Sequence, residues 1–479
     1  MATIIGRKKE IDELMRIYRS PLAQFVAVYG RRRVGKTYLV RELFKDEFAF
    51  YFTGISPVEL KGKSLLSAQL TAFASALQLY GYDGEDVPQS WLQAFDMLIK
   101  LLMQKPKDRR MVVFIDEMPW LDTPRSGFVS AFEHFWNGWG AGQENLMLIV
   151  CGSASSWIKE NLINSYGGLY NRVTSEIRLA PFSLGETEEL LTSLGVTMSR
   201  YDILQLYIAL GGIPMYLSYV IPGRSLAQTI DALFFERDAK LKLEYTRMFR
   251  SIFNGVELYQ QVVDLLAKHH GGLTREEIMT ALGITSGNRI TNLLRTLEAS
   301  DFIEAYKPFE RTMRSRVYRL IDPFCIFFKA IVEGKRRSEN FWRENQSRGA
   351  LNVWRGSAFE NAALLHVKQI LRAMGVDGVS HEAAPWAIKP TDANRGMQLD
   401  LVIVRNDRVV NVCEMKFLNT KFTVTADYEQ ALRARQAFVS EHFGPRYNVQ
   451  MTLVSALGLA FGKHSGIFQN SVTIDDLFT

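Results

Sequence analysis

The chain has 479 residues, of which 47% are hydrophobic and 23% are charged, and its formal net charge is +6. This composition is close to the globular average, which excludes a collagen-like, low-complexity or wholly disordered chain. The length predicts about three domains of roughly 100–200 residues. No apolar run approaches the roughly 18–20 residues of a membrane helix, and the first residues lack a secretion signal's apolar core. We expect a cytoplasmic protein without a membrane partner.

The three cysteines, Cys151, Cys325 and Cys413, lie far apart in apolar surroundings. Disulfide and zinc frameworks use closely spaced or evenly paired cysteines. The pattern therefore favours reduced thiols in the core of a cytosolic protein.

Strand-like and helix-like stretches alternate over residues 1–180. The predicted strands are Gln24–Tyr29, Phe48–Phe52, Met111–Ile115 and Leu146–Cys151. Short apolar strands separated by helices are typical of a parallel α/β sheet. Residues 181–250 keep only the helical signal, which predicts a helical lid.

Residues 251–325 read as a separate small domain. Three helices are predicted at Val256–His269, Thr274–Leu282 and Thr285–Ala299, and two strands at Phe302–Tyr306 and Arg316–Leu320. This order is that of a winged helix, although other small α/β domains share it.

A charged linker or bridging helix is expected over 326–355, followed by a last α/β domain over 356–479. The elements predicted there are a helix at Ser357–Met374, strands at Gln398–Val404 and Arg408–Phe417, a helix at Thr425–His442 and a strand at Val449–Ser455.

The clearest functional motif follows the first predicted strand. Gly30-Arg-Arg-Arg-Val-Gly35-Lys36-Thr37 fits the pattern G-x-x-x-x-G-K-[ST], and a helix is expected directly after it. The backbone N–H groups of such a loop surround a β-phosphate, the lysine reaches the β- and γ-oxygens, and the threonine hydroxyl binds Mg²⁺. We expect ATP to bind through Gly30, Arg33, Gly35, Lys36, Thr37 and Tyr38.

An acidic pair ends another predicted strand. Asp116 is expected to hold Mg²⁺ with Thr37, and Glu117 to act as the general base for the attacking water. The alternative is an ordinary solvated strand end. The presence of a phosphate loop favours the catalytic interpretation.

Two further residues are candidates for the same site. Ser153 ends the strand Leu146–Cys151 and is placed to sense the γ-phosphate or to orient water, although a helix cap near Ser155 explains this region equally well. Arg172 is a candidate arginine finger, acting in cis or in trans, and the alternative is a surface arginine.

A second site is predicted in the last domain. Asp400, Glu414 and Lys416 lie within otherwise apolar strands, and Glu360 lies on the preceding helix. Two carboxylates with a lysine suit a Mg²⁺ or Mn²⁺ site that cleaves a phosphodiester. The alternative is a buried Asp/Glu–Lys cluster without catalysis.

Basic and amide residues of the predicted winged helix are candidates for DNA contact, the alternative being an ordinary solvated surface. They are Asn288, Arg289, Asn292, Arg295, Arg311, Arg314 and Arg316.

Taken together, the phosphate loop, the Asp-Glu strand, Cys151-Gly-Ser153, Gly211-Gly-Ile-Pro214 and the terminal strands resemble archaeal-type P-loop ATPases of the STAND/AAA+ lineage. Members of that group join an ATPase and a winged helix to a C-terminal PD-(D/E)xK nuclease-like domain. The resemblance implies that Gly6, Arg7 and Glu10 frame the nucleotide.

The resemblance also implies that Gly212 and Pro214 lie near the adenine. Asp400, Glu414 and Lys416 match its D…ExK pattern, and Glu360 matches its helical acidic position. Leu399 replaces the usual proline before Asp400.

The resulting hypothesis is an ATPase whose nucleotide state controls a metal-dependent DNA nuclease, with mobile-element or phage defence as the implied role. The alternative is an ATP-driven switch or transcriptional regulator whose nuclease-like domain only binds DNA or protein. A homo-oligomer is required if Arg172 acts in trans.

Overall fold

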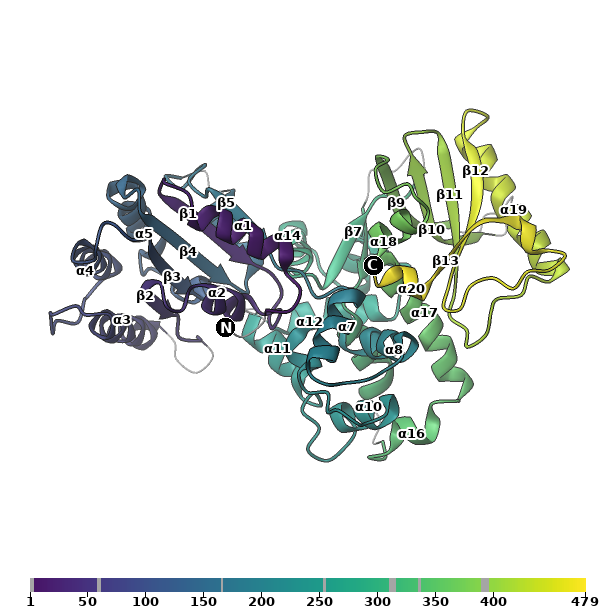
Figure 1. Ribbon diagram of the computed structural model, residues 1–479, viewed down its shortest axis with the longest axis horizontal. Coiled ribbons are helices and arrows are strands. Elements are labelled where there is room, and N and C mark those ends of the chain that lie inside the picture. The colour runs from purple at the N-terminus through teal and green to yellow at the C-terminus, as the bar shows by residue number, and fades with distance from the viewer. Residues whose placement is uncertain are drawn as a thin grey trace. The chain divides into compact units, whose positions relative to one another are not determined.

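A computed structural model describes residues 4–57, 62–164, 167–252, 256–309, 316–334, 337–388 and 396–479, and Figure 1 labels most of their helices and strands. The chain forms two compact units. The first comprises Met1–Pro181, Thr246–Val256 and Arg295–Asp301. The second comprises Phe182–Tyr245, Glu257–Leu294 and Phe302–Thr479.

The first unit is built on a five-stranded parallel sheet with the order β2-β3-β4-β1-β5. Its strands are β1 (Gln24–Tyr29), β2 (Phe48–Thr53), β3 (Met111–Asp116), β4 (Leu146–Gly152) and β5 (Ser175–Arg178). All residues of β3 and β4 are buried, as expected of parallel strands covered on both faces. The predicted α/β class with a parallel sheet is confirmed. Because β4 lies between β1 and β3, the loops after these three strands share one edge of the sheet.

Helices surround this sheet. They are α1 (Lys8–Tyr18), α2 (Lys36–Phe44), α3 (Gly62–Leu79), α4 (Trp91–Met103), α5 (Phe128–Gly138) and α6 (Ser155–Ile158), with short helical turns at Met118–Trp120, Gly140–Gly142 and Lys159–Ile163. Aromatic rings join α3, α4 and α5, since Trp91 packs edge-on against Phe73 and Phe128. The Ser90 hydroxyl caps α4 by accepting from the Gln93 N–H.

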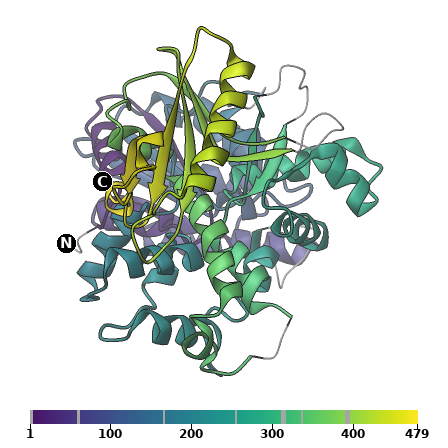
Figure 2. The same ribbon diagram turned by 90° about the vertical axis from the view of Figure 1, so that its right-hand side faces the viewer.

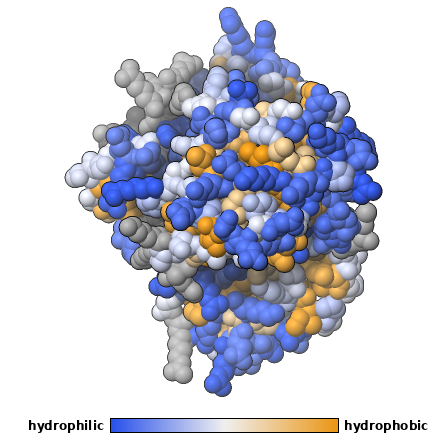
Figure 3. All heavy atoms as spheres, turned by 90° about the vertical axis from the view of Figure 1, so that its left-hand side faces the viewer, coloured by the Kyte–Doolittle hydropathy of each residue, from blue (hydrophilic) through white to orange (hydrophobic). Residues whose placement is uncertain are grey.

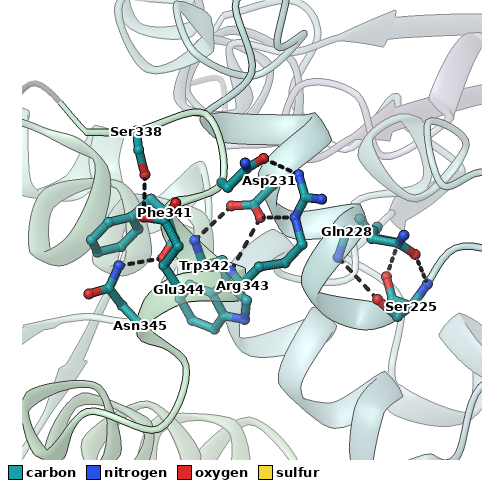
Figure 4. Close-up of polar contacts among 11 residues, drawn as sticks. Ser225, Gln228, Asp231, Ser338, Phe341, Trp342, Arg343, Glu344 and Asn345 are labelled. Atoms are coloured by element: carbon teal, nitrogen blue, oxygen red, sulfur yellow. Dashed lines mark hydrogen bonds and ion pairs between the residues drawn. The ribbon is translucent and has the colours of Figure 1, made fainter.

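The second unit starts with helices. These are α7 (Leu184–Ser193), α8 (Arg200–Leu210), α9 (Pro214–Leu217) and α10 (Leu226–Phe234), and α11 (Glu244–Ile252) then enters the first unit. Capping boxes start α7 and α10; Figure 4 shows the one formed by Ser225 and Gln228. Gly212 has φ +63°, and a Cβ there would lie 2.2 Å from the Phe182 carbonyl oxygen, so the position requires glycine.

A small antiparallel sheet with the order β6-β8-β7 follows. Its elements are α12 (Val256–Ala267), β6 (Leu273–Thr274), α13 (Arg275–Leu282), α14 (Gly287–Ala299), β7 (Ile303–Tyr306) and β8 (Val317–Leu320). The helices and the hairpin occur in the expected order, and β6 adds a strand that the sequence did not reveal. The identification as a winged helix stays a prediction.

Within the segment expected to be a linker, several aromatic residues are buried. The elements are α15 (Pro323–Phe327), a π-helical turn (Phe328–Val332) and α16 (Phe341–Asn345). Asp231, fully buried on α10, accepts from the N–H groups of Trp342 at 2.7 Å and Arg343 at 3.2 Å. It also accepts from Arg343 Nε at 2.9 Å (Figure 4). This carboxylate fixes the start of α16 to α10.

The C-terminal part contains a mixed sheet with the order β13-β12-β11-β10-β9. The strands are β9 (His381–Ile388), β10 (Met397–Arg405), β11 (Val409–Lys416), β12 (Asn448–Ser455) and β13 (Phe468–Thr473), and the helices are α17 (Gly349–Leu365), α18 (Val367–Ala373), α19 (Ala426–Phe443) and α20 (Ile474–Leu477). Strands β9, β10 and β11 pair antiparallel, whereas β11, β12 and β13 pair parallel. Figure 2 shows α19 lying across the sheet, where Leu432 and Val439 join its core.

The expected helix 357–374 is divided in the structure. Helix α17 starts at Gly349 and ends at Leu365, and His366 separates it from α18. His366 is buried, and its Nε2 accepts from the Leu184 N–H at 3.0 Å. Burial lowers the pKa of His366 to about 4, so the ring is neutral and acts as this acceptor.

No helix of the described residues is long and apolar enough to cross a membrane. In Figure 3 hydrophilic residues dominate the face shown, and hydrophobic residues form separate islands among them. All three cysteines are buried and free.

Replacing Asp231 by alanine tests the link between α10 and α16. The change leaves the Trp342 and Arg343 N–H groups without their acceptor, so we expect the free energy of unfolding to fall by roughly 2–4 kcal/mol. Urea denaturation of both proteins measures this. Asp238→Ala, at an exposed position of the same region, is the control and should change stability by less than about 0.5 kcal/mol. Equal effects of the two changes would contradict the assigned role of Asp231.

Candidate functional site

The loop between β1 and α2 has the backbone shape of a phosphate loop. Gly30, Arg33 and Gly35 have positive φ angles of 148°, 72° and 93°. A Cβ at Gly30 would lie 2.1 Å from the Leu179 carbonyl oxygen, so this position excludes any larger residue. The loop leads directly into the N-terminus of α2, where backbone N–H groups favour an anion.

The side chain of Lys36 contacts the backbone of this loop. Its ammonium donates to the carbonyl oxygens of Gly30 at 3.0 Å and Arg31 at 3.1 Å, and to Ser153 Oγ at 3.1 Å. The residue is only 5% exposed. An ammonium has three protons, and these three acceptors account for all of them. The charge is therefore held at the loop itself.

Thr37 and Asp116 meet beside Lys36. The Thr37 hydroxyl donates to Asp116 Oδ2 at 2.8 Å, and the Glu117 N–H donates to Asp116 Oδ1 at 2.9 Å. Burial, together with the charge of Glu117, raises the pKa of Asp116. A buried carboxylate of this kind is stabilised by a cation, and a hydroxyl with a carboxylate is a ligand set that Mg²⁺ accepts. These residues fit a magnesium ion that arrives with a nucleotide.

Ser153 joins the lysine to the acidic pair. Its N–H donates to Glu117 Oε2 at 3.1 Å, and its hydroxyl donates to Glu117 Oε1 at 2.8 Å while accepting from Lys36. The strand order explains this relay of Lys36, Ser153 and Glu117. Ser153 follows β4, which lies between β1, whose loop leads to Lys36, and β3, which ends just before Glu117. Glu117 has φ +47°, a left-handed conformation that turns the chain sharply after β3.

The other residues predicted for this site are placed less closely. Tyr38 is 50% exposed. Arg172 is exposed, and the structure does not place it in the relay. Arg7 is buried and donates to the Val34 carbonyl oxygen at 3.1 Å, so it supports the phosphate loop. Gly212 and Pro214 belong to the second unit.

The second predicted site forms a buried charge cluster in the C-terminal sheet. β10 and β11 are antiparallel neighbours, which brings Asp400 beside Glu414. Asp400 Oδ2 accepts from the Met415 N–H at 2.9 Å. Lys416 Nζ lies 2.6 Å from Glu414 Oε1. The cluster predicted from the sequence is thus assembled.

Two residues that sequence reasoning missed complete this cluster. Tyr428 and Arg435 on α19 each donate to a carboxylate oxygen of Glu414. They are seven residues apart, which places them on one face of a helix, and this spacing is the signal that could have found them. Both oxygens of Glu414 therefore have partners.

The carboxylates of this cluster differ in charge. Burial, with the charge of Asp400, raises the pKa of Glu360 to about 7, and burial, with the charge of Glu414, raises the pKa of Asp400 to about 6. Burial alone would also raise the pKa of Glu414, but the Lys416 and Arg435 cations hold it below its usual value. Glu414 is thus the member that is firmly ionised.

Among the described residues, the arrangement of this cluster gives the predicted nuclease metal no support. Glu360 and Asp400 line a cavity of about 50 Å³, but Glu414 does not line it and is bound to three donors. Among the described residues no three His, Cys, Asp or Glu side chains form a group that could hold a metal. Two cations of the protein, Lys416 and Arg435, pair with the Glu414 carboxylate.

The residues predicted to contact DNA are only partly described. Asn288, Arg289, Asn292, Arg295 and Arg316 are exposed, and Arg295 pairs with Glu160 at 3.5 Å. Arg311 and Arg314 lie outside the described residues.

Comparison with known proteins bears on the first site. Residues 4–220 match a family model described as an ATPase domain predominantly from Archaea. An uncharacterized protein of Methanocaldococcus jannaschii is 23% identical over 429 residues, which cover 87% of this chain and 88% of that protein.

Solved structures are also similar. A Walker-type ATPase of Pyrococcus abyssi has a TM-score of 0.46 and 17% identity, over 68% of this chain and 96% of that one. The ORC2 protein of Aeropyrum pernix, in ADPNP and ADP complexes, has a TM-score of 0.39 and 14% identity, over 68% and 93%. A STAND protein of Pyrococcus horikoshii with a tetratricopeptide repeat sensor has a TM-score of 0.31 and 14% identity, over 78% and 50%.

The family match covers the part of the chain that carries the phosphate loop. The family match ends at residue 220. The winged helix and the nuclease-like domain beyond it stay predictions.

Ser153→Ala tests the relay. The change removes the hydroxyl that joins Lys36 to Glu117 but keeps the loop, so we expect kcat for ATP hydrolysis to fall about tenfold with little change in KM. Steady-state phosphate release measures both constants. Ser155→Ala is the matched control, because the buried Ser155 hydroxyl has no hydrogen-bond partner among the described residues. A rate loss as large in Ser155→Ala would contradict the relay.

Proposed function

We propose that this protein is an ATP-driven switch, in which hydrolysis at the phosphate loop changes the state of the second unit. The observation that carries the proposal is the Lys36–Ser153–Glu117 relay beside the Thr37–Asp116 pair. This arrangement joins the group that binds phosphate to the group that can take a proton from water.

In the proposed reaction the loop N–H groups and Lys36 bind the phosphates. Bound Mg²⁺ would neutralise phosphate charge, and Thr37 and Asp116 are the residues that would hold it. Glu117 accepts the proton of the attacking water, and Ser153 orients the Glu117 carboxylate. A phosphate must draw Lys36 away from its present acceptors, which alters the restraint on Glu117. Arg172 as an arginine finger, and Gly212 and Pro214 near the adenine, remain part of the proposal.

Control of the second unit is supported by contacts inside the first. Arg31, within the phosphate loop, is fully buried and its Nη2 lies 3.2 Å from Met248 Sδ on α11. Arg178, at the end of β5, pairs with the buried Asp301. Met248 and Asp301 lie on the two short segments that the first unit takes from the later chain. Each segment continues directly into the second unit, so a movement of the loop has a covalent route there. The size of this conformational change is limited by the difference in ATP affinity between the two states.

Hydrogen exchange tests this route. We expect a non-hydrolysable ATP analogue with Mg²⁺ to change amide exchange in α11 and α12 as well as in the phosphate loop, because Arg31 contacts α11. Lys36→Ala should abolish the effect, and Lys45→Ala, at an exposed lysine just after α2, should preserve it. A change confined to the loop and α2 would contradict control of the second unit, while intact hydrolysis would leave the ATPase itself established.

A second candidate activity is DNA cleavage by the C-terminal domain. It is favoured by the placement of Asp400, Glu414 and Lys416 together on two paired strands, with Glu360 on α17. The same placement also suits the non-catalytic alternative, a nuclease-like domain that only binds DNA or protein. Defence against mobile elements or phage, and assembly into a homo-oligomer, belong to the proposal as consequences of the resemblance.

Incubation with supercoiled DNA, ATP and Mg²⁺ or Mn²⁺ separates the two. If the domain is a nuclease, Asp400→Ala and Lys416→Ala should each reduce cleavage at least about a hundredfold, because they remove the acidic and the basic member of the cluster. Lys421→Ala, an exposed lysine outside the cluster, should cleave like the wild type. Absence of cleavage by the wild type with either metal would select the binding function.

A further inference from the structure

A hollow of about 700 Å³ lies at the edge of the parallel sheet opposite the phosphate loop. Its lining includes the residues that precede β1, β3 and β4, such as Pro21, Arg110 and Asn145. In a parallel sheet the amino ends of the strands share one edge, and the nucleotide loops lie at the other. The hollow is therefore separate from the ATPase site, and its volume is within the roughly 300–1,000 Å³ of ligand sites.

Positive charge gathers in this basic hollow, which we define by Met103, Lys105, Lys107, Arg109, Arg110 and Trp139. Two carboxylates, Asp108 and Glu144, also line it but are outnumbered by the four cations. Lys105 donates to the Tyr80 carbonyl oxygen at 2.6 Å. Within the described ranges none of the four cations forms an ion pair, so their charge has no direct partner.

Arg110 shows the electrostatic cost of this arrangement. It is half-buried and donates to the carbonyl oxygens of Leu22 at 3.0 Å and Glu144 at 2.7 Å. Its Nε is buried and has no hydrogen-bond partner among the described residues. Burial lowers the pKa of this guanidinium, because carbonyl dipoles replace its hydration only in part. An anion in the hollow would offset that cost.

The loop that carries the other cations is held in place. Asn145 Nδ2 donates to the carbonyl oxygens of Lys107 at 3.3 Å and Arg109 at 2.9 Å, and both of these side chains are exposed. Met103 is 66% exposed and Trp139 is half-buried, so two apolar side chains line the hollow together with the cations. Cations held on an ordered loop beside an aromatic side chain, as in this basic hollow, are the combination that proteins use to bind single-stranded nucleic acid.

We propose that the basic hollow binds a single strand of nucleic acid, with Lys107 and Arg109 on its phosphates and Trp139 beside a base. An acidic protein segment would use the same cations but not the tryptophan. This site lies outside the ATPase site and the C-terminal cluster, so it adds a nucleic-acid contact that the proposed switch does not require.

The test is fluorescence anisotropy of a labelled single-stranded oligonucleotide with the full-length protein. The double change Lys107→Glu and Arg109→Glu should weaken binding at least about tenfold, because two phosphate contacts become repulsive. It should also lower the slope of log affinity against log salt by about 1.4, at about 0.7 per lost contact. Trp139→Leu should weaken binding while leaving that slope unchanged, since it removes stacking rather than charge.

The matched control is Lys240→Glu with Lys242→Glu, an equal charge reversal at exposed lysines of the second unit. It should retain wild-type affinity, and all variants should retain wild-type ATP hydrolysis as evidence of folding. Equal weakening by the control, no oligonucleotide binding by the wild type, or tighter binding of polyglutamate than of the oligonucleotide would each overturn the proposal.

Discussion

The three hydrogen bonds of the Lys36 ammonium are the interactions on which the phosphate-loop site of the first unit depends. They bring together oxygens from the turn after β1 and from the end of β4. Such proximity exists because the strand order places β4 beside β1 and leaves β3 one position further. A buried cation needs acceptors, and these acceptors belong to separate loops. The charge therefore imposes a common geometry on loops that the sequence keeps more than a hundred residues apart.

The C-terminal cluster resolves the same electrostatic problem differently. There the buried carboxylate Glu414 is balanced by Lys416 and Arg435, which are cations of the protein itself. Within the described residues Asp400 and Glu360 form no ion pair, and burial together with a neighbouring carboxylate raises the pKa of each. The first site has a carboxylate and a hydroxyl that fit an arriving ion. The second has a principal carboxylate that cations of the protein already neutralise.

The sequence predicted those features that depend on local chemistry. Lys36, Thr37 and Asp116 followed from a fixed spacing and an apolar strand, and the parallel sheet followed from buried strands. The strands that were missed, β5, β6, β9 and β13, all lie at sheet edges, where one side faces no neighbouring strand. In β5, β9 and β13 polar residues also interrupt the apolar pattern. Ser153 was foreseen at the strand end, but its two hydrogen bonds to Glu117 depend on strand order, which local periodicity does not encode. Arg435 was missed because its contact with Glu414 depends on how α19 lies on the sheet, which the sequence pattern does not give.

The first unit is built from three separate segments of the chain, and this has a consequence for its folding during synthesis. Its sheet is complete at residue 178, yet Met248 and Asp301, which contact Arg31 and Arg178, are translated much later. During synthesis more than a hundred further residues must be added after the sheet before its contact with Asp301 can form. Part of the second unit is synthesised in that interval. Contacts so distant in sequence slow folding because their loop-closure entropy must be met first. The two units therefore cannot mature strictly one after the other from the ribosome. The phosphate loop gains its contact with Met248, and β5 its contact with Asp301, only after those residues have been synthesised.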